Sequence, residues 1–324
     1  MVSCALLENG PWGAARLVEL DTTNTLIMNH VRTTVHICLL LAAPLGPAMA
    51  WGAAYALPQD GSQVVGAITR VRTRYEDTLA ALAQEYGLGY REVVDANPDV
   101  DPWIPGEGTE VVLPTAYVLP DTPREGLVIN VAEYRLYYYP PNRDLVVTYP
   151  VGLGRDEFRT PLVTTRIVTA IENPTWTPTP SSRKEHAAMG NPLPTVVPPG
   201  PDNPLGSLAL QLDIPGYFIH GTNQPFGVGQ MVSHGCIRLY EPHIATLAEL
   251  ARKGTPVHIV NEPYKVGWRD DELFLEVHRG VYEPADPEEL RKRVHQATKN
   301  RAAVIDWARI DDLADSPTGV PARI

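Results

Sequence analysis

Residues 217–239 read YFIHGTNQPFGVGQMVSHGCIRL, and this stretch decides how the rest of the chain is interpreted. A strand-like run ends at His220, a turn with two glycines follows, and Cys236 arrives 16 residues after His220. A free thiol is only slightly ionised near neutral pH, so a nucleophilic cysteine needs an imidazole beside it to accept its proton. We expect His220 to be that base if the end of its strand faces the loop of Cys236. Backbone N–H groups beside Gly235 could then stabilise the developing oxyanion.

Residues 1–50 are expected to be a leader that includes a secretory signal peptide. One positive charge at Arg32 precedes an apolar run, and the small residues Ala48-Met49-Ala50 follow it. This order is typical of a signal peptide, and the run is too short to span a bilayer. We expect translation to start at Met28, cleavage to follow Ala50, and the protein to be periplasmic. An internal apolar strand is the alternative.

Cleavage would remove Cys4 and Cys38 and leave Cys236 as the only cysteine. A single thiol in an oxidising compartment must be hidden, paired with another molecule or used. Two alternatives to catalysis remain open. The cysteine and both histidines could be satisfied in a core, or His220, His234 and Cys236 could bind zinc with His243 outside the set. Structural zinc sites usually show a paired spacing that this H-x-C lacks, so we favour a catalytic cysteine.

The composition is typical of a globular protein with many loops. A length of 324 residues suggests about two folded units. The 27 basic and 38 acidic side chains give a net charge of −11, which disfavours nucleic acid as a partner. The 32 prolines favour strands and loops over long helices.

Residues 125–262 are predicted to form a mainly β domain with one packed helix. The helix should begin at Pro242, bury Ile244, Leu247, Leu250 and Ala251, and close at Gly254. Residues 180–204 are rich in Pro, Gly and Ser and are expected to be a loop that forms a wall or lid of the site. The predicted strands are 127–130, 135–139, 145–151, 162–171, 208–212, 217–220 and 257–260.

Residues 66–115 show a β-α-α-β order, with Asp77 as the expected cap of the first helix and Gly87 at its end. The segments DTLAALAQEYGL, REVVDANPDVDPW and IPGEGTEVVLP resemble a LysM domain, although Glu76 stands where glycine is usual. The resemblance implies binding to N-acetylglucosamine polymers such as the glycan strands of peptidoglycan. A helical spacer without a ligand is the alternative.

The stretch around Cys236 resembles the signature of L,D-transpeptidase catalytic domains of the YkuD or ErfK type. That signature is a histidine, a spacer, then Ser or Thr, His-Gly-Cys, a hydrophobic residue, and Asn or Arg; here residues 221–232 are the spacer between His220 and Ser233. The segments 198–206 (PPGPDNPLG), 219–223 (IHGTN) and 264–278 (YKVGWRDDELFLEVH) are also similar to periplasmic members. The implied fold is an L,D-transpeptidase-like β-sandwich.

The resemblance also implies roles for individual residues. Cys236 would be the nucleophile and His220 its base, oriented by the backbone of Gly221 or Thr222. Arg238 stands where many members carry asparagine, and it could anchor a substrate carboxylate or form a structural salt bridge. The residues expected around the oxyanion and the substrate are Ser233, His234, Gly235, Cys236, Arg238, Gly221, Thr222 and Asn223.

The implied reaction removes the terminal D-alanine from peptidoglycan tetrapeptide stems through a Cys236 thioester. An amine of a neighbouring stem or of an envelope lipoprotein would then take the acyl group, whereas water would give carboxypeptidase activity. Carbapenem acylation is implied as well. No cofactor or metal is expected. A non-catalytic wall-binding protein is the alternative. A papain-like peptidase is disfavoured, because in those enzymes the cysteine precedes the histidine along the chain.

Residues 263–324 are expected to be a charged C-terminal extension with one surface helix. Asp286 would cap this helix, Pro287 would lie in its first turn and Glu289 would bond back to the cap. No chemistry is assigned to the extension.

Overall fold

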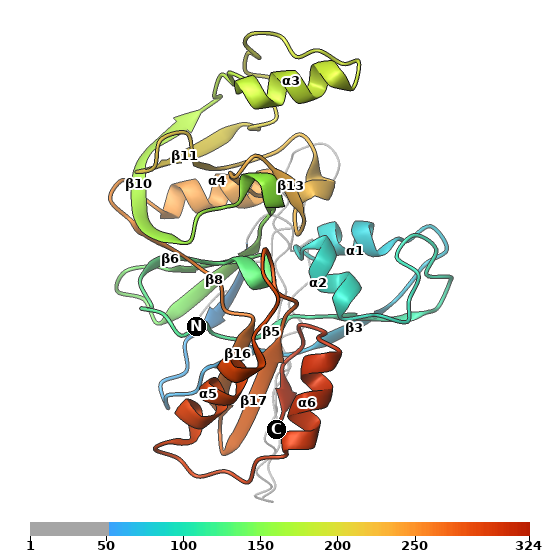
Figure 1. Cartoon of the computed structure of the whole chain (residues 1–324), viewed down its shortest axis with the longest axis vertical. Coiled ribbons are helices and arrows are strands. Elements are labelled where there is room, and N and C mark those ends of the chain that lie inside the picture. Colours follow the sequence, from blue (N-terminus) through green and yellow to red (C-terminus); the bar gives the residue numbers. More distant parts are fainter. Residues whose placement is uncertain (1–51) are drawn as a thin grey trace, which may run out of the picture. The chain divides into compact units, whose positions relative to one another are not determined.

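The computed structural model describes residues 52–324 (Figure 1). The expected leader over residues 1–50, with its signal peptide and its start at Met28, lies outside the described residues. Within the described part, every helix is too short or too polar to cross a membrane.

The main sheet has nine strands in the order β1-β8-β7-β6-β15-β10-β11-β12-β14. Its neighbours are antiparallel except for the parallel pairs β15–β6 and β12–β14. The strands are β1 (Ala53–Ala56), β6 (Gly126–Asn130), β7 (Arg135–Tyr139), β8 (Leu145–Pro150), β10 (Val163–Glu172), β11 (Leu208–Leu212), β12 (Phe218–His220), β14 (Ile237–Arg238) and β15 (Pro256–Val260). All seven predicted strands are confirmed, and β1 and β14 are additions.

Strand β10 joins the two halves of the sheet because it changes partner along its length. Residues 163–166 pair with β15, and residues 167–172 pair with β11 after a register shift near Ile167. Side chains from both halves form one hydrophobic core with helix α4 (Glu241–Leu250). The predicted mainly β architecture with one packed helix is therefore confirmed.

Helix α4 corrects two details of the prediction. Pro242 is its second residue, because the helix begins at Glu241. Leu250 was expected in the core but is 40% exposed, whereas Ile244 and Leu247 are fully buried. Leu250 is the last helical residue, and the chain turns away there so that Ala251 enters the core instead.

The segment between β10 and β11 is not an irregular loop as predicted, because it contains helix α3 (Pro180–Ala188). Thr179 caps this helix by accepting a hydrogen bond from the Ser182 backbone N–H, and Pro180 occupies the first helical position. Ser182 is the only buried residue of α3. The helix therefore has no apolar stripe that a periodicity search could detect.

The expected βααβ order is present as β3 (Thr69–Arg72), α1 (Leu79–Glu85), α2 (Tyr90–Asp95) and β4 (Glu110–Leu113), which we call the βααβ unit. It has its own small core. The cap of α1 is Thr78 and not Asp77, because the helix begins at Leu79. The Asp77 carboxylate instead accepts a hydrogen bond from the Arg74 backbone N–H.

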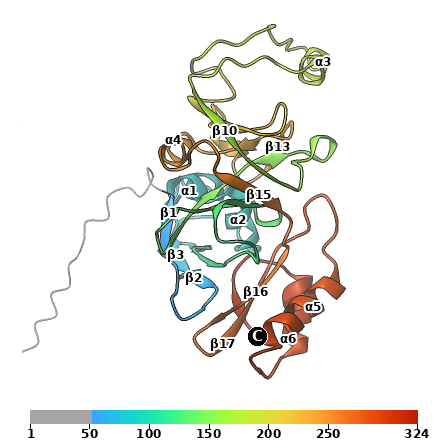
Figure 2. The ribbon, with the colours of Figure 1, turned by 90° about the vertical axis from the view of Figure 1, so that its left-hand side faces the viewer.

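Residues 263–324 contain more structure than the single predicted helix. Helix α5 (Pro287–Thr298) begins after Asp286, which caps it as expected, but Glu289 pairs with Arg293 rather than with the cap. The structure adds α6 (Trp307–Asp315) and a sheet of β16 (Tyr264–Arg269), β17 (Glu272–Val277) and β18 (Ala322–Arg323). Figure 2 shows α5 and α6 beside this sheet.

Three short elements and two strand pairs complete the described part. The strands β2 (Val64–Gly66) and β5 (Ala116–Val118) pair with each other, as do β9 (Leu153–Gly154) and β13 (Met231–Ser233). The 3-10 turns are η2 (Val131–Glu133), η3 (Asp156–Phe158) and η4 (Pro225–Gly227). Strand β13 leads directly into the turn of Cys236.

Candidate active site

The parallel pairing of β12 and β14 brings His220 and Cys236 to one cavity. In this pair His220 lies opposite Arg238, and Cys236 precedes Arg238 by two residues. Cys236 lies directly before β14, so this pairing places its loop beside the end of β12. His220, Cys236 and Arg238 line a cavity of about 960 Å³. The expected proximity of the strand end and the cysteine loop is therefore present in the structure.

His220 is held as a neutral base. Its Nδ1 lies 2.6 Å from the Gly221 carbonyl oxygen, which can only accept, so Nδ1 carries the proton and Nε2 is free to accept one. Burial lowers the pKa of His220 to about 4, and the positive charge of Arg238 acts in the same direction. The imidazole is consequently neutral at physiological pH.

Cys236 is a free thiol whose pKa is raised by burial. A backbone hydrogen bond at Phe218 and the charge of Arg238 oppose this increase without cancelling it. The Sγ lies 3.6 Å from the Gly216 carbonyl oxygen. Both groups are therefore uncharged at rest, and a reaction at the sulfur would require the thiol proton to move to a base.

The turn before Cys236 requires glycine at position 235. The Gly235 N–H is engaged in a hydrogen bond within this turn. Gly235 has a φ of +106°, and a Cβ there would lie 2.8 Å from the Tyr217 ring. Its N–H donates to Ser233 Oγ at 3.1 Å, and this hydroxyl donates to the Cys236 carbonyl at 2.6 Å. Within residues 52–324 the Cys236 N–H donates to no protein group. It is therefore the available backbone donor beside the thiol.

His234 lies on the cavity wall in a cluster of charged side chains. Its ring packs on Phe158 with centroids 4.4 Å apart. Its Nε2 lies 3.1 Å from Glu185 Oε2 and 3.2 Å from an Arg155 guanidinium nitrogen. Burial and the positive charge of Arg155 lower the pKa of His234.

Arg238 lines the same cavity without an acidic partner. No carboxylate in the described part of the chain lies within 4.0 Å of its guanidinium, and its buried Nε has no hydrogen-bond partner there. Burial lowers the pKa of Arg238. The alternative of a structural salt bridge is therefore not supported, and the cation is available to a ligand.

The other expected residues divide between the cavity and the layer behind it. Glu241 accepts a hydrogen bond from the Thr222 N–H at 2.6 Å and packs against Gly221, which fixes the backbone that orients His220. Of the expected set, Gly221, Thr222 and Gly235 do not line the cavity, whereas His220, Asn223, Ser233, His234, Cys236 and Arg238 do.

Three further residues of the site, Arg155, Phe158 and Glu185, are not predicted from the sequence. Arg155 and Glu185 line the cavity, and many residues of the predicted wall 180–204 line it as well. Neither Arg155 nor Glu185 lies in a sequence motif that predicts a role at the site, because each contacts His234 only through the tertiary fold.

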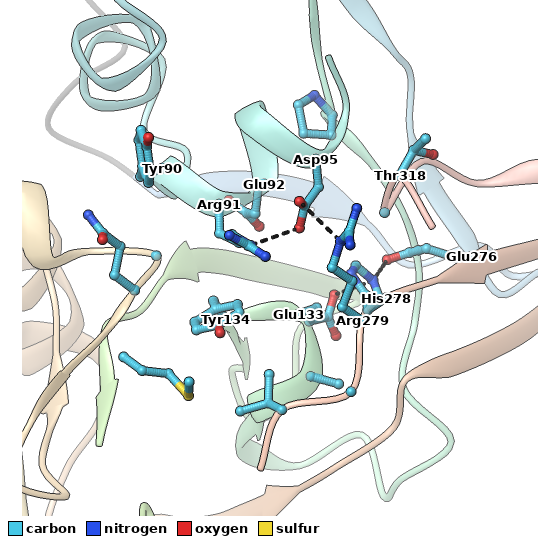
Figure 3. A pocket seen from close by; sticks show the side chains of 18 of the residues that line it. Tyr90, Arg91, Glu92, Asp95, Glu133, Tyr134, Glu276, His278, Arg279 and Thr318 are labelled. Carbon is cyan, nitrogen blue, oxygen red and sulfur yellow. Dashed lines mark hydrogen bonds and ion pairs between the residues drawn. The ribbon is translucent and has the colours of Figure 1, made fainter. Parts of the chain in front are cut away.

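A second cavity, of about 370 Å³, lies beside α2 and β17 (Figure 3). Asp95 lies between two guanidinium groups there, 3.3 Å from Arg91 and 3.6 Å from Arg279. Near them Glu133, Glu276 and His278 form the only metal-compatible set among residues 52–324.

The ammonium group of Lys265 occupies the centre of this acidic set. Its Nζ lies 2.6 Å from Glu133 and 2.7 Å from Glu276, so the protein supplies its own cation. His220, His234 and Cys236 do not form a metal-compatible set, and the zinc alternative is not supported. His243 instead packs between the Tyr149 and Tyr240 rings.

Comparisons with known proteins agree on one family. A model of the L,D-transpeptidase catalytic domain (YkuD) matches residues 124–259. In Escherichia coli K12, the probable L,D-transpeptidase YcfS is 40% identical over 83% of this chain and 87% of its own length. The probable L,D-transpeptidase ErfK/SrfK is 39% identical over 88% and 92%.

Another relative and a solved structure carry the same description. The probable L,D-transpeptidase YbiS of the same strain is 39% identical over 83% of this chain and 91% of its own length. The crystal structure of L,D-transpeptidase 3 from Mycobacterium tuberculosis matches with a TM-score of 0.31 at 17% identity, over 48% of this chain and 72% of that one.

Proposed function

This chain belongs to the L,D-transpeptidase family, and on that premise we propose how its own residues carry out the reaction. The enzyme is a cell-wall acyltransferase that acts on the peptide stems of peptidoglycan. The observation that carries the assignment of residues is that His220, the last residue of β12, and Cys236, directly before the parallel strand β14, line one cavity. Cys236 is the nucleophile and His220 is its base.

The first half-reaction forms a thioester. Cys236 Sγ attacks the carbonyl of the diamino acid that precedes the terminal D-alanine of a tetrapeptide stem. As the S–C bond forms, His220 Nε2 accepts the thiol proton, which the neutral resting pair still holds. The C–N bond to D-alanine then breaks, and the proton passes from His220 to the leaving amine.

The second half-reaction transfers the acyl group. An acceptor amine attacks the thioester carbonyl, the new C–N bond forms and the C–S bond breaks. The proton lost by the amine returns through His220 to the sulfur. We propose the amine of a neighbouring stem or of a lysine of an envelope lipoprotein as the acceptor. Water in its place gives a shortened stem and no crosslink.

The surrounding residues stabilise and orient the substrate. The backbone from His234 to Cys236 faces the oxyanion, with the Cys236 N–H as its donor. Ser233 holds this turn by bonding to Gly235 and Cys236. Arg238, which has no protein carboxylate within 4.0 Å in the described part, binds a carboxylate of the stem. Asn223 lines the same wall.

The βααβ unit provides a candidate surface for glycan strands. Tyr75 is 86% exposed in the loop before α1, and Trp103 and Ile104 are 61% and 80% exposed in the loop after α2. The flat apolar faces of these aromatic rings are available for stacking against sugar rings. This supports a LysM-like domain over residues 66–115 as the wall-binding part of the enzyme.

The other proposed domain boundaries lie between secondary-structure elements. We place the catalytic domain at residues 125–262 and the C-terminal extension at 263–324. Because the substrate is the cell wall, we place the mature enzyme in the periplasm, after removal of the leader over residues 1–50.

Replacement of the nucleophile tests the mechanism. Cys236→Ala should abolish release of D-alanine from purified tetrapeptide muropeptides, measured by mass spectrometry, while circular dichroism stays that of the wild type. Ser316→Ala, an exposed position in the C-terminal part, is the matched control and should keep full activity. A carbapenem should add its mass to the wild type and not to Cys236→Ala. D-alanine release by Cys236→Ala would show that the enzyme uses another nucleophile.

A further inference from the structure

Helix α3 reaches the catalytic turn through one side chain, Glu185. Its two carboxylate oxygens accept hydrogen bonds from both terminal nitrogens of Arg155, at 2.6 and 2.8 Å. The oxygen at 2.8 Å also lies 3.1 Å from His234 Nε2. This bidentate geometry is the strongest form of a carboxylate–guanidinium contact. Arg155 holds the pKa of Glu185 near 2, so the carboxylate stays charged.

The segment between β10 and β11, residues 173–207, is called the excursion here. Apart from Glu185, its hydrogen bonds are made at its base or within the excursion itself. At the base the Asn173 N–H donates to the Ser207 carbonyl at 2.8 Å, and Ser207 bonds to Glu241. Higher up, Trp176 pairs with Val197. Figure 1 shows α3 at the far end of this excursion, beyond β10 and β11.

In the described part of the chain, Glu185 makes the only side-chain hydrogen bonds and ion pairs from α3 to residues outside the excursion. Its partners lie directly at the catalytic centre. His234 is two residues before Cys236, and Arg155 follows β9, which pairs with β13. The Arg155 guanidinium also lies 5.3 Å from the Phe158 ring, on which His234 packs. The contact therefore ties the far end of the excursion to the wall of the cavity, which Arg155, Glu185 and His234 line.

We propose that Glu185 is a positioning residue that fixes α3 over the cavity, so that the donor stem is held and the thioester reacts with an amine rather than with water. The inference rests on the proposed function. Trp176, Leu193 and Val197 of the excursion form part of the cavity wall. If the far end were released, this wall would move outward and admit solvent to the thioester.

The expected effect separates binding from chemistry. Glu185 does not contact His220 or Cys236 in the structure, so thioester formation at saturating donor should change little. Loss of a partly exposed ion pair should raise KM for the donor by roughly two- to five-fold. The ratio of hydrolysis to transfer should rise by a similar factor.

The experiment compares Glu185→Gln with Lys184→Gln, an exposed position on the same helix. Each full-length enzyme is incubated with a disaccharide tetrapeptide donor and with glycine as a small amine acceptor. Mass spectrometry quantifies the hydrolysed and the transferred product, and melting curves verify the fold. Glu185→Gln should show the higher KM and the higher hydrolysis ratio, and Lys184→Gln should match the wild type.

A double-mutant cycle with Arg155→Gln keeps the test specific. Because both side chains act through one contact, the double variant should be no worse than the poorer single variant. Additive effects on KM, or a Glu185→Gln enzyme equal to Lys184→Gln in both readouts, would overturn the proposal. Such a result leaves the chemistry intact, whereas D-alanine release by Cys236→Ala would reject the proposed function itself.

Discussion

The ionisation of two side chains decides how this enzyme starts its reaction. A cysteine that is stored as a thiolate needs a neighbour that is charged in the resting state, but burial lowers the pKa of His220 and raises that of Cys236. Both groups are therefore neutral before the substrate arrives. In the proposed mechanism His220 acts as a base only while the carbonyl is attacked, and its Nδ1–H bond to Gly221 keeps Nε2 available for the proton.

The pH dependence of the first half-reaction should reflect this. With a pKa of about 4, His220 is the neutral base at any higher pH and is lost by protonation only below it. The kcat/KM for D-alanine release should therefore fall on the acid side near pH 4, and not near the ordinary histidine value of about 6.5. In Arg238→Gln the acid limb should move to higher pH, because the cation that depresses the pKa is gone. A wild-type acid limb near pH 6.5 would contradict the neutral pair.

At the scale of elements, helix α2 is joined to the catalytic sheet by a buried ion pair. Arg135 of β7 donates to both carboxylate oxygens of Glu92, at 2.6 and 2.8 Å, and its guanidinium lies 4.3 Å from the Tyr117 ring. The start of α2 also packs on the chain that leads to β13. A Cβ on Gly229 would lie 2.5 Å from the Tyr90 nitrogen, so only glycine allows this approach.

Breaking that pair should be costly. Glu92→Gln leaves the buried Arg135 guanidinium without its carboxylate, and we expect the free energy of unfolding to fall by about 3–5 kcal/mol. Glu110→Gln, which removes a surface partner of Arg70, should cost at most about 1 kcal/mol. Urea denaturation of the three proteins measures both differences. Equal stability of the two variants would show that Glu92 and Arg135 do not form a buried pair in solution.

In the whole molecule, buried polar contacts also attach residues 263–324 to the catalytic part. Lys265 of β16 bonds to Glu133 of η2, and Glu276 of β17 accepts the Val118 N–H at 2.6 Å. Both acidic side chains are fully shielded from solvent. The extension expected from the sequence thus contributes to the buried interior and is more than a surface helix.

The proposed wall-binding surface makes a prediction for the enzyme as a whole. Trp103→Ala should weaken co-sedimentation with purified sacculi by roughly three- to ten-fold, because an exposed ring for stacking is lost. Turnover of a soluble muropeptide should be unchanged, since Trp103 does not line the catalytic cavity. The control is Val304→Ala, which alters an apolar side chain that is 98% exposed in the C-terminal part. Undiminished sedimentation of Trp103→Ala would remove this surface from the glycan-binding proposal.

Features that depend on neighbouring residues along the chain could be predicted from the amino-acid order. The seven strands, the βααβ order and the cap at Asp286 follow from local patterns of apolar, turn and capping residues. The pairing of His220 with Cys236 could be predicted because the reaction requires both groups. Which residues orient and surround them could be stated only from the family resemblance.

Only the tertiary structure decided the contacts between distant segments. Glu185 and Arg155 meet at His234 although 30 and 79 residues separate Arg155 from its two partners. The unpaired state of Arg238 and the use of the Gly235 N–H by Ser233 also depend on how the segments pack. Helix α3 was missed because it buries almost nothing, so its residues have no apolar period. A long-range contact is selected by the packing of the whole chain, and it leaves no trace in the order of neighbouring residues.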